Sequence, residues 1–293
     1  MVIAFIMDYY LSNYYFKDWK NVSTYQKDFW NVTHKGGVYN VAIFGSSRAF
    51  HSVNPKVLGI KSKWMNFGSD GTSHGDHFLF LHQALENNEM DTIMLEVDEF
   101  TLSGYETNTD PFKEYVFALK VKESPFKETS KDYMDAVKNT IWKLPLTKFL
   151  EYNSFYSLGY GPSYDKNTFN ESFGFEGLES DTFNKNFEGD SVVCSIHPID
   201  IKYLENFISL ANKMNKVTIL FTAPVHPRFL EKEKNRNMSI FKIQEIAKKY
   251  NVDYFDYSTI FEQKQRYFAD YTHLNRSGAD KFTIIMRDRI NGR

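Results

Sequence analysis

Short apolar runs alternate along the chain with longer amphipathic stretches. Each run ends near a glycine, a proline or a polar residue, which is typical of buried strands in parallel sheets. The run Val41-Ala-Ile-Phe44, for example, ends at Gly45. The pattern predicts strands at 41–44, 63–67, 92–97, 217–222 and 252–257.

The amphipathic stretches between these runs carry apolar residues at helical spacing. In one of them, Leu204, Phe207 and Ile208 occupy positions i, i+3 and i+4. The pattern predicts helices at 75–87, 200–212, 239–250 and 277–290. Strands and helices that alternate in this way predict an α/β fold, in which helices cover both faces of a parallel sheet.

The alternation lapses between residues 100 and 190, where aromatic residues are mixed with Gly, Pro, Ser and Asn. A structureless loop of this length is uncommon inside a compact domain. We therefore expect a large inserted subdomain or lid at 100–190, helical from about 111 to 150, within a domain that spans 41–293. The aromatic residues of the insertion fit either a local core or a platform for glycans.

Residues 1–40 are interpreted as a separate N-terminal segment. Its first seven residues are apolar, which is too short for a signal-peptide core or a membrane span. Two interpretations stay open: an ordinary buried segment, or the outer end of a membrane anchor that begins upstream. The second implies an extracytoplasmic protein. The single cysteine, Cys194, is compatible with that location but does not establish it, and a cytoplasmic location stays open.

Charge and cysteine content exclude some classes of function. The chain has 293 residues, with 35 Lys plus Arg against 37 Asp plus Glu, and its net charge of −2 argues against a nucleic-acid binder driven by charge. One cysteine rules out an intramolecular disulfide and a cysteine-based zinc site. His74 and His77 flank Asp76, but they lack a clear further ligand set, so we expect no metal and no cofactor.

Three polar segments fall where the predicted strands end or the last helix begins. They are Gly45-Ser46-Ser47-Arg48, the block at 66–73, and Asp270-Tyr-Thr-His273-Leu-Asn275. Ligands of open parallel sheets bind beyond the carboxyl ends of the strands. We therefore expect these segments to meet at one site.

The residue types in these segments fit acyl transfer. A serine on a tight turn is exposed for attack, and Gly45 permits such a turn. His273 is suited to take the serine proton, and Asp270 can orient its imidazole. Gly71 lets the backbone approach a substrate and donate an N–H group. Each segment taken alone also fits ordinary turn or capping chemistry.

Together these blocks resemble the SGNH (GDSL-type) hydrolase superfamily. The pattern is similar to its membrane-associated branch, which includes the teichoic-acid D-alanylation accessory protein and the alginate O-acetyltransferase-like proteins. The resemblance covers residues 41–98 and about 198–290, and Asp270-x-x-His273 is its most specific part. It implies a flavodoxin-like three-layer α/β/α sandwich with a serine nucleophile and no metal.

By position, the resemblance makes Ser47 the nucleophile, Asp270 and His273 the rest of the triad, and the Ser47 and Gly71 amides the oxyanion donors. The third-block asparagine of the family is missing, because the chain has Glu96-Val97-Asp98-Glu99 there. A carboxylate cannot stabilise an oxyanion unless it is protonated, and losing one donor typically costs about 10²- to 10³-fold in rate. This departure fits a specialised transferase or a degenerate site.

Four further residues are candidates for substrate binding: Arg48, Asn66, Asp98 and His226. Arg48 suits an anionic or sugar substrate, and a structural ion pair is the alternative. His51, His74 and His77 lie near the expected site in sequence.

These observations favour a serine-dependent esterase or O-acyltransferase. Its expected substrate, by resemblance, is an O-acylated cell-surface glycan or a small ester, and its expected partner is a membrane-bound acyltransferase. The alternative is a catalytically degenerate glycan-binding or assembly component of a membrane-bound acylation or export complex. A cytosolic lipase or thioesterase is a third interpretation.

Overall fold

A parallel five-stranded sheet forms the centre of the protein. The computed structural model describes residues 37–103, 173–179 and 192–292, which belong to one compact unit formed by 31–109 and 167–293. The strand order is β2-β1-β3-β5-β7, and every neighbouring pair is parallel. The strands are β1 Gly37–Phe44, β2 Trp64–Asn66, β3 Asn88–Glu96, β5 Val217–Thr222 and β7 Asp253–Asp256. Counted along the chain, this is the flavodoxin-like order 2-1-3-4-5.

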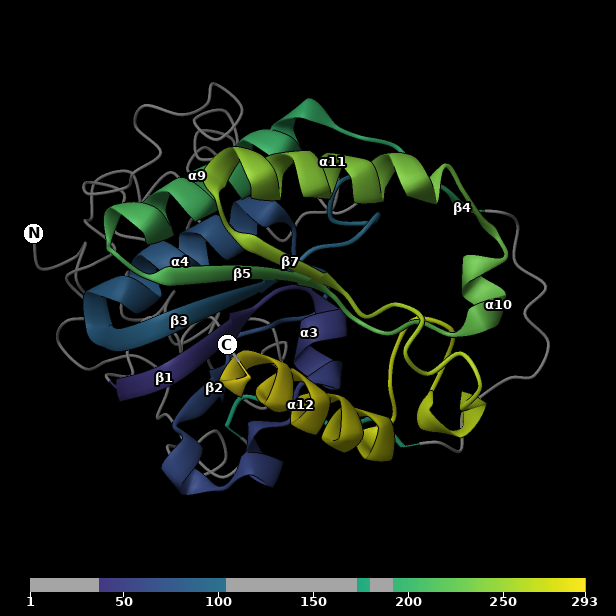
Figure 1. The fold of residues 1–293 in the computed structure, drawn as a ribbon, viewed down its shortest axis with the longest axis horizontal. Coiled ribbons are helices and arrows are strands. Elements are labelled where there is room, and N and C mark those ends of the chain that lie inside the picture. The colour runs from purple at the N-terminus through teal and green to yellow at the C-terminus, as the bar shows by residue number, and fades with distance from the viewer. Residues whose placement is uncertain (1–36, 104–172, 180–191, 293) are drawn as a thin grey trace, which may run out of the picture. The chain divides into compact units, whose positions relative to one another are not determined.

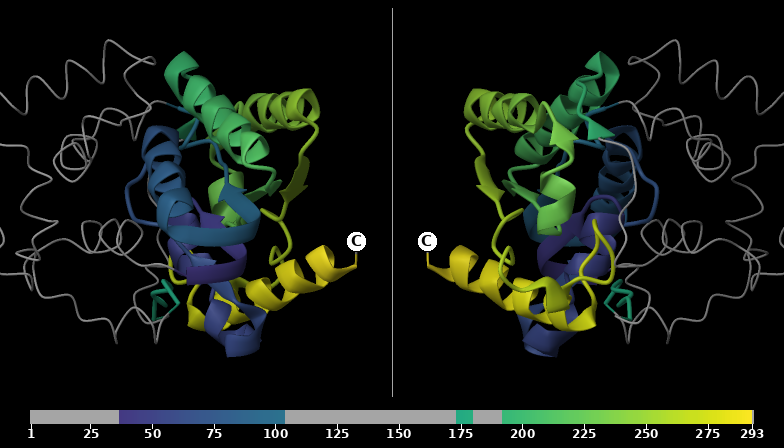
Figure 2. Two further views of the ribbon diagram at one scale, coloured as in Figure 1. Left: turned by 90° about the vertical axis from the view of Figure 1, so that its left-hand side faces the viewer. Right: turned by 90° about the vertical axis from the view of Figure 1, so that its right-hand side faces the viewer.

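Helices cover both faces of the sheet (Figures 1 and 2). One face carries α4 (His74–Asn87), α9 (Pro198–Lys213) and α11 (Arg236–Tyr250). The opposite face carries α3 (Ser47–Ser52) and α12 (Arg276–Asn291). The fold is therefore a three-layer α/β/α sandwich, and the predicted fold class is confirmed.

Shorter elements connect these layers. They are η2 Pro55–Leu58, η3 Ile60–Ser62, β4 Val192–Val193, α10 Pro227–Leu230, β6 Glu233–Lys234 and η7 Gln265–Tyr267. Strands β4 and β6 pair in parallel as a separate two-stranded sheet. In the part of the chain that the structure describes, no helix combines the length and apolar character needed to cross a membrane.

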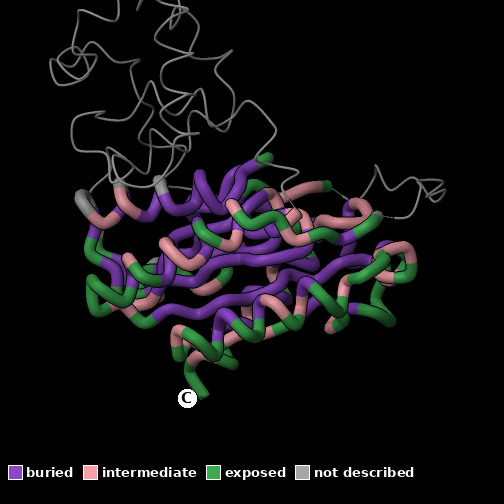
Figure 3. Tube along the Cα trace, turned by 90° about the horizontal axis from the view of Figure 1, so that it is seen from above, coloured by how far each residue is buried: buried purple, intermediate pink, exposed green. Residues whose placement is uncertain are grey.

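Apolar side chains fill both spaces between the sheet and its helices, and Figure 3 shows the buried strands in the middle of the unit. On the α9 side, the Phe44 ring centroid lies 5.6 Å from that of Phe207. On the α12 side, Phe282 lies 6.2 Å from Phe221 and 5.3 Å from Tyr257. These four phenylalanines are among the side chains with the least exposed surface. Burial on both faces explains why the strands read as continuous apolar runs.

The five predicted strands are all present, and their ends differ by a few residues. Strand β1 begins at Gly37, four residues before the predicted strand, because Gly37 to Tyr39 pair with the start of β3. Strand β2 begins at Trp64, since Lys63 has a positive φ of 52° that breaks the extended backbone. The predicted helix at 111–150, most of the insertion at 100–190 and residues 1–36 lie outside the described residues.

Gly278 tests how closely α12 packs against the loop before it. A Cβ atom at Gly278 would collide with the backbone carbonyl oxygen of Tyr267. We expect Gly278→Ala to lower the free energy of unfolding by roughly 1–3 kcal/mol, as overpacking does. Helix propensity alone predicts the opposite change, a gain in the free energy of unfolding, since alanine is favoured over glycine in helices by about 1 kcal/mol.

Chemical denaturation of the variant measures this change. The matched control is Ser277→Ala at the exposed neighbouring position, which should stay within about 0.5 kcal/mol of the wild type. A Gly278→Ala protein as stable as the wild type would contradict the close packing.

Candidate active site

The side chains of Ser47, His273 and Asp270 form a hydrogen-bonded series at the carboxyl end of the sheet. Ser47 is the first residue of α3, which follows β1, and the other two lie in the loop before α12. His273 Nε2 lies 2.8 Å from Ser47 Oγ, and His273 Nδ1 lies 2.8 Å from Asp270 Oδ2. Because Nδ1 faces a carboxylate, it carries the proton, and Nε2 is left to accept the serine hydroxyl. The structure therefore brings together the three residues that the sequence pattern singled out.

Asp270 is held as a carboxylate by four donors. Its Oδ1 atom accepts hydrogen bonds from the backbone N–H groups of Thr272 (2.7 Å) and His273 (2.8 Å) and from the Thr272 hydroxyl (3.1 Å). Burial alone would raise the pKa of Asp270, but the hydrogen bonds from His273 and Thr272 outweigh it and lower the pKa to about 2. Asp270 is therefore ionised at neutral pH and can orient the imidazole.

The turn between β1 and α3 separates the roles of two adjacent serines. Ser46 caps α3, and its hydroxyl forms hydrogen bonds with the Arg48 N–H (3.4 Å) and with Glu96 Oε2 (3.2 Å). Gly45 has a φ of 147°, and a Cβ atom there would lie 2.5 Å from the Glu96 Cβ atom. Ser46 is therefore buried beneath the turn, whereas the partly exposed Ser47 reaches His273.

The block at 66–73 lies against the same turn. The Ser69 N–H and the Thr72 hydroxyl both donate to the Gly45 carbonyl oxygen, at 3.0 and 3.3 Å. Gly71 lies between them with a φ of 63°. Among the described residues, the N–H groups of Ser47 and Gly71 have no acceptor, so both are available to a bound oxyanion.

Asn66 holds two neighbouring backbone segments together by hydrogen bonds. It is 1% exposed, its amide donates to the carbonyls of Ala49 and Val53 at 2.9 and 2.8 Å, and its Oδ1 atom accepts from the Gly68 N–H. The sequence suggested a substrate contact for Asn66. The structure instead places it between α3 and the turn at 68–73, where it joins the two.

His226 is fully buried at the start of α10. Its Nδ1 atom accepts the Arg228 N–H at 3.2 Å, and its ring packs edge-on against Phe268 and Tyr271. Its backbone N–H donates to the Tyr271 carbonyl oxygen. His226 therefore supports the loop that carries Asp270, rather than facing a ligand.

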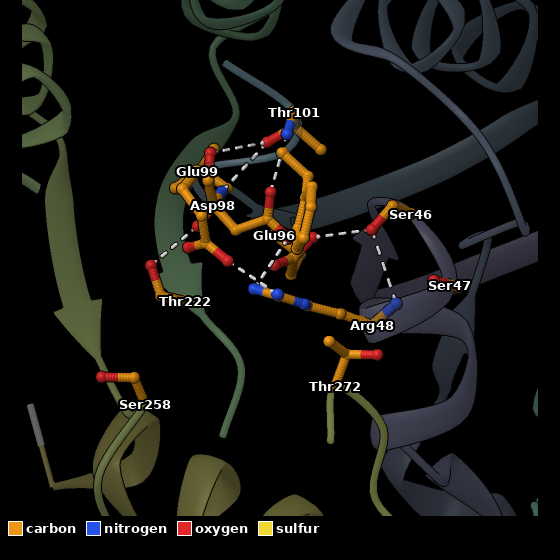
Figure 4. Close-up of polar contacts among 12 residues, drawn as sticks. Ser46, Ser47, Arg48, Glu96, Asp98, Glu99, Thr101, Thr222, Ser258 and Thr272 are labelled. Atoms are coloured by element: carbon orange, nitrogen blue, oxygen red, sulfur yellow. Dashed lines mark hydrogen bonds and ion pairs between the residues drawn. The ribbon is translucent and has the colours of Figure 1, made fainter. Parts of the chain in front are cut away.

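Arg48 and Asp98, also suggested as substrate contacts, pair with each other near Ser47 (Figure 4). Arg48 is 2% exposed, and its guanidinium lies 3.0 Å from Asp98 Oδ2 and 2.7 Å from Glu99 Oε1. The guanidinium carbon also lies 5.0 Å from the centre of the Phe100 ring. Asp98 in turn accepts the Thr101 N–H at 2.7 Å. Both side chains therefore have internal partners and no exposed surface to offer a substrate.

The ion pair of Arg48 belongs to a larger buried group of charges. Its carboxyl groups are those of Glu96, Asp98, Glu99 and Glu233. The second guanidinium is that of Arg236, whose Nε atom lies 3.2 Å from Glu233 Oε2. Four carboxylates would outnumber two guanidiniums, and an unbalanced buried charge is very unfavourable.

Proton uptake restores the balance of this cluster. Burial raises the pKa of Glu96 well above its ordinary value, and burial together with a hydrogen bond to Glu99 raises the pKa of Glu233 to about 9. Burial would also raise the pKa of Glu99, but the charge of Arg48 outweighs it and lowers that pKa. With Glu96 and Glu233 protonated, fewer carboxylates share the two guanidiniums, of which Arg236 also pairs with Asp256.

This charge state bears on the missing asparagine. Glu96 is the last residue of β3, and the pattern that the sequence resembles has its asparagine just after this strand. The Glu96 carboxyl is fully buried against Ser46. A neutral Glu96 places no negative charge near the proposed oxyanion donors. Compared with the pattern that the sequence resembles, the chain therefore lacks one donor, and a neutral Glu96 adds no negative charge in its place.

His74 and His77 pack against each other behind the site. Their Nδ1 atoms lie 3.4 Å apart, and His77 Nε2 lies 2.9 Å from the Thr72 hydroxyl. Burial lowers both pKa values, that of His74 to about 3. Asp76 is occupied in capping α4 through Ser73. Across the described ranges, no three His, Cys, Asp or Glu side chains are arranged to hold a metal ion.

Two features of the site were not assigned from sequence. Glu233 joins the Arg48 cluster from β6, and nothing in its local pattern signals this. His51 packs its ring against His273, with the ring centres 5.6 Å apart. The spacing of four between Ser47 and His51 was the available signal, because it places both residues on one side of α3.

No protein-family model matches the sequence, and no curated protein matches it. Several solved structures have a similar backbone trace. One from Streptococcus pneumonia, described as a candidate platelet activating factor, is 14% identical, with a TM-score of 0.49 and 99% of each chain covered. A GDSL-like lipase from Bacteroides thetaiotaomicron is 9% identical, with a TM-score of 0.45 and 92% of this chain and 98% of that chain covered.

A lipase/acylhydrolase from Enterococcus faecalis is 13% identical, with a TM-score of 0.40 and 87% of this chain and 96% of that chain covered. At these identities and scores the likenesses do not establish an activity, and the function proposed below depends on the chain's own side chains.

The buried acidic cluster gives a test of its charge state. The folded-state pKa of Glu233 is raised, so ionisation of this residue costs stability as the pH rises from its ordinary value of 4.5 toward about 9. We expect Glu233→Gln, which keeps the shape without the charge, to raise Tm by several degrees at pH 8. The gain should shrink toward pH 5, where the wild-type residue is also neutral.

Thermal unfolding at the two pH values measures this difference, because each kcal/mol moves Tm by about 2–4 °C in a domain of this size. Glu245→Gln is the control, since Glu245 pairs with Lys242 at the surface. A loss of stability in Glu233→Gln that is equal at both pH values would show that Glu233 is not protonated in the fold.

Proposed function

We propose that the protein is a serine-dependent acyl-transfer enzyme, either an esterase or an O-acyltransferase. One observation carries this proposal: Ser47 Oγ lies 2.8 Å from His273 Nε2, while Asp270 holds the opposite nitrogen. A nucleophile, a base and a group that orients the base are thereby aligned in the order that acyl transfer requires.

The proposed reaction begins when Ser47 Oγ attacks the carbonyl carbon of an ester. His273 Nε2 takes the hydroxyl proton, and Asp270 stabilises the resulting imidazolium. The negative oxygen of the tetrahedral intermediate accepts hydrogen bonds from the Ser47 and Gly71 amides. The intermediate then expels the alcohol, which takes the proton from His273, and leaves the acyl group on Ser47.

The second half of the reaction repeats these steps with a new nucleophile. His273 takes a proton from water or from an acceptor hydroxyl, whose oxygen attacks the acyl-serine. Collapse of the second tetrahedral intermediate releases the acid or the transferred ester and returns the proton to Ser47. Water as the acceptor makes the enzyme an esterase, and a sugar hydroxyl makes it an O-acyltransferase.

An O-acylated cell-surface glycan is the substrate class that we propose, with a membrane-bound acyltransferase as partner. Support for both comes from the sequence resemblance to the membrane-associated branch of the superfamily. They are separate from the proposal of serine chemistry, which the site geometry supports.

Labelling with a fluorophosphonate tests the nucleophile. We expect one covalent adduct on the wild type by intact mass, and none on Ser47→Ala, because the Ser47 hydroxyl lies against the free nitrogen Nε2 of His273. Ser46→Ala is the matched control. It loses a helix cap worth about 1 kcal/mol but should still be labelled, since Ser46 contacts Glu96 rather than His273.

Equal labelling of Ser47→Ala would assign the chemistry to another residue. An unlabelled, folded wild type would favour the binding or assembly component instead.

Asp270→Asn tests the orientation of the base. The amide cannot hold Nδ1–H as the carboxylate does, and we expect the rate of acyl release from a small chromogenic ester to fall roughly 10³- to 10⁴-fold. Asp256→Asn, an exposed aspartate paired with Arg236, is the control and should retain the rate.

The same assay with O-acylated and deacylated glycans tests the substrate class. Turnover of small esters with no turnover of any acylated glycan would contradict the glycan assignment but not the serine mechanism.

A further inference from the structure

A short segment crosses the site beside α3. Residues 173–179, here named the strap, are bound at both ends. The Asn66 N–H donates to the Phe173 carbonyl oxygen at 3.0 Å, and the Arg276 N–H donates to the Leu178 carbonyl oxygen at 2.9 Å. Leu178 also forms a parallel bridge with Asn275. The strap therefore runs from the end of β2 to the start of α12.

His51 lies where the strap, the turn at 68–73 and the catalytic loop meet. Its Nδ1 atom lies 2.7 Å from the Glu176 carbonyl oxygen in the strap, and its Nε2 atom lies 2.9 Å from Asp70 Oδ1 in the turn. Its ring packs edge-on against that of His273, at an interplanar angle of 86°. One side chain of α3 therefore contacts all three segments.

The two hydrogen-bond partners of His51 determine its protonation. A backbone carbonyl oxygen can only accept a hydrogen bond, and an ionised carboxylate can only accept as well. Both ring nitrogens must therefore carry a proton to satisfy both contacts, and a ring with two N–H groups is an imidazolium. A neutral His51 would turn a bare nitrogen lone pair toward one of these oxygen atoms.

We propose that His51 is a positioning residue, which as an imidazolium ties the Asp70–Gly71 turn and the strap to α3 beside the catalytic His273. The proposal rests on the proposed function, because the turn holds Gly71, one of the two oxyanion donors. His51 touches neither the reacting serine nor a substrate. It acts through the loops that it joins.

Titratable groups face His51 from three segments: Asp70 from the turn, Glu176 from the strap, and His273 with Asp270 behind it from the catalytic loop. Burial opposes the charge, but the hydrogen bond and charge of Asp70, aided by Glu176, outweigh it and raise the pKa of His51 above its ordinary value.

The raised pKa of His51 determines how the contacts of this side chain depend on pH. A raised pKa means that the contacts are complete at low and neutral pH and are lost as the pH rises through the pKa of His51 in the fold. The reaction of Ser47 should therefore show an alkaline limit that His51 sets.

The charge on His51 can be observed directly by NMR. In protein labelled with ¹⁵N-histidine, the His51 signals are those that disappear from the spectrum of a His51→Gln variant. We expect both ring nitrogens of His51 to be protonated at pH 7. In Asp70→Asn, which keeps the acceptor oxygen but removes the charge, His51 should lose its proton at a lower pH. A neutral His51 in the wild type at pH 6 would overturn the proposal.

The effect on the site is measured by the rate of fluorophosphonate labelling against pH. At pH 8 we expect Asp70→Asn to react roughly three- to tenfold more slowly than the wild type, as for the loss of one ordinary hydrogen bond. The two should differ little at pH 6. The matched control is Glu205→Gln, which breaks the surface ion pair with Lys249 and should follow the wild-type profile. Superimposable profiles for Asp70→Asn and the wild type would show that His51 does not position the site.

Amide hydrogen exchange separates failure of this proposal from failure of the proposed function. If Ser47 proves unreactive in every variant, the acyl-transfer function fails, and the exchange rate of the buried Ser69 amide, which ties the turn to the Gly45 carbonyl oxygen, still tests the contact. We expect that rate to rise in Asp70→Asn and in His51→Gln relative to Glu205→Gln. An unchanged rate in both variants would overturn the positioning role.

Discussion

The close approach of backbone at Gly45 is the constraint on which the rest of the site depends. Without a side chain there, the end of β1 passes directly against Glu96 of β3 and Ala49 of α3. The Gly45 carbonyl oxygen then accepts hydrogen bonds from two residues of the neighbouring turn. One glycine thereby brings α3, which carries Ser47, close to the turn that carries Gly71. A larger residue would separate both from β3.

Beneath this turn the protein buries an ionic cluster where an apolar core would be simpler. Removing charged groups from water is unfavourable, and the attraction between Arg48 and its carboxylates has to offset that cost. The ion pairs fix the orientation of the Arg48 side chain. A guanidinium that binds Asp98 and Glu99 while stacking on Phe100 has one position, and Arg48 is the residue that follows the nucleophile. Protonation of Glu96 and Glu233 keeps the cluster from accumulating negative charge.

The fold and the meeting of Ser47, His273 and Asp270 were predictable because their signals are local. Apolar runs mark the strands, and the Asp270-to-His273 spacing lies within one loop. The roles of Arg48, Asp98, Asn66 and His226 were not predictable in the same way. A buried polar side chain and an exposed one look alike in a sequence, and only the partner distinguishes them. The partners of Arg48 are 50 and 51 residues away, and Glu233 comes from a two-residue strand that no pattern indicates.

The separation of Ser47 and His273 has a consequence for how the protein becomes active during its synthesis. The two residues are 226 positions apart, so the ribosome must add the whole intervening chain before the base exists. At about 5–20 residues per second, this takes roughly ten seconds or more. During that interval the growing polypeptide presents a serine with an ordinary, unreactive hydroxyl. In the acyl-transfer mechanism proposed above, the nascent chain therefore carries no activated serine before the domain has closed.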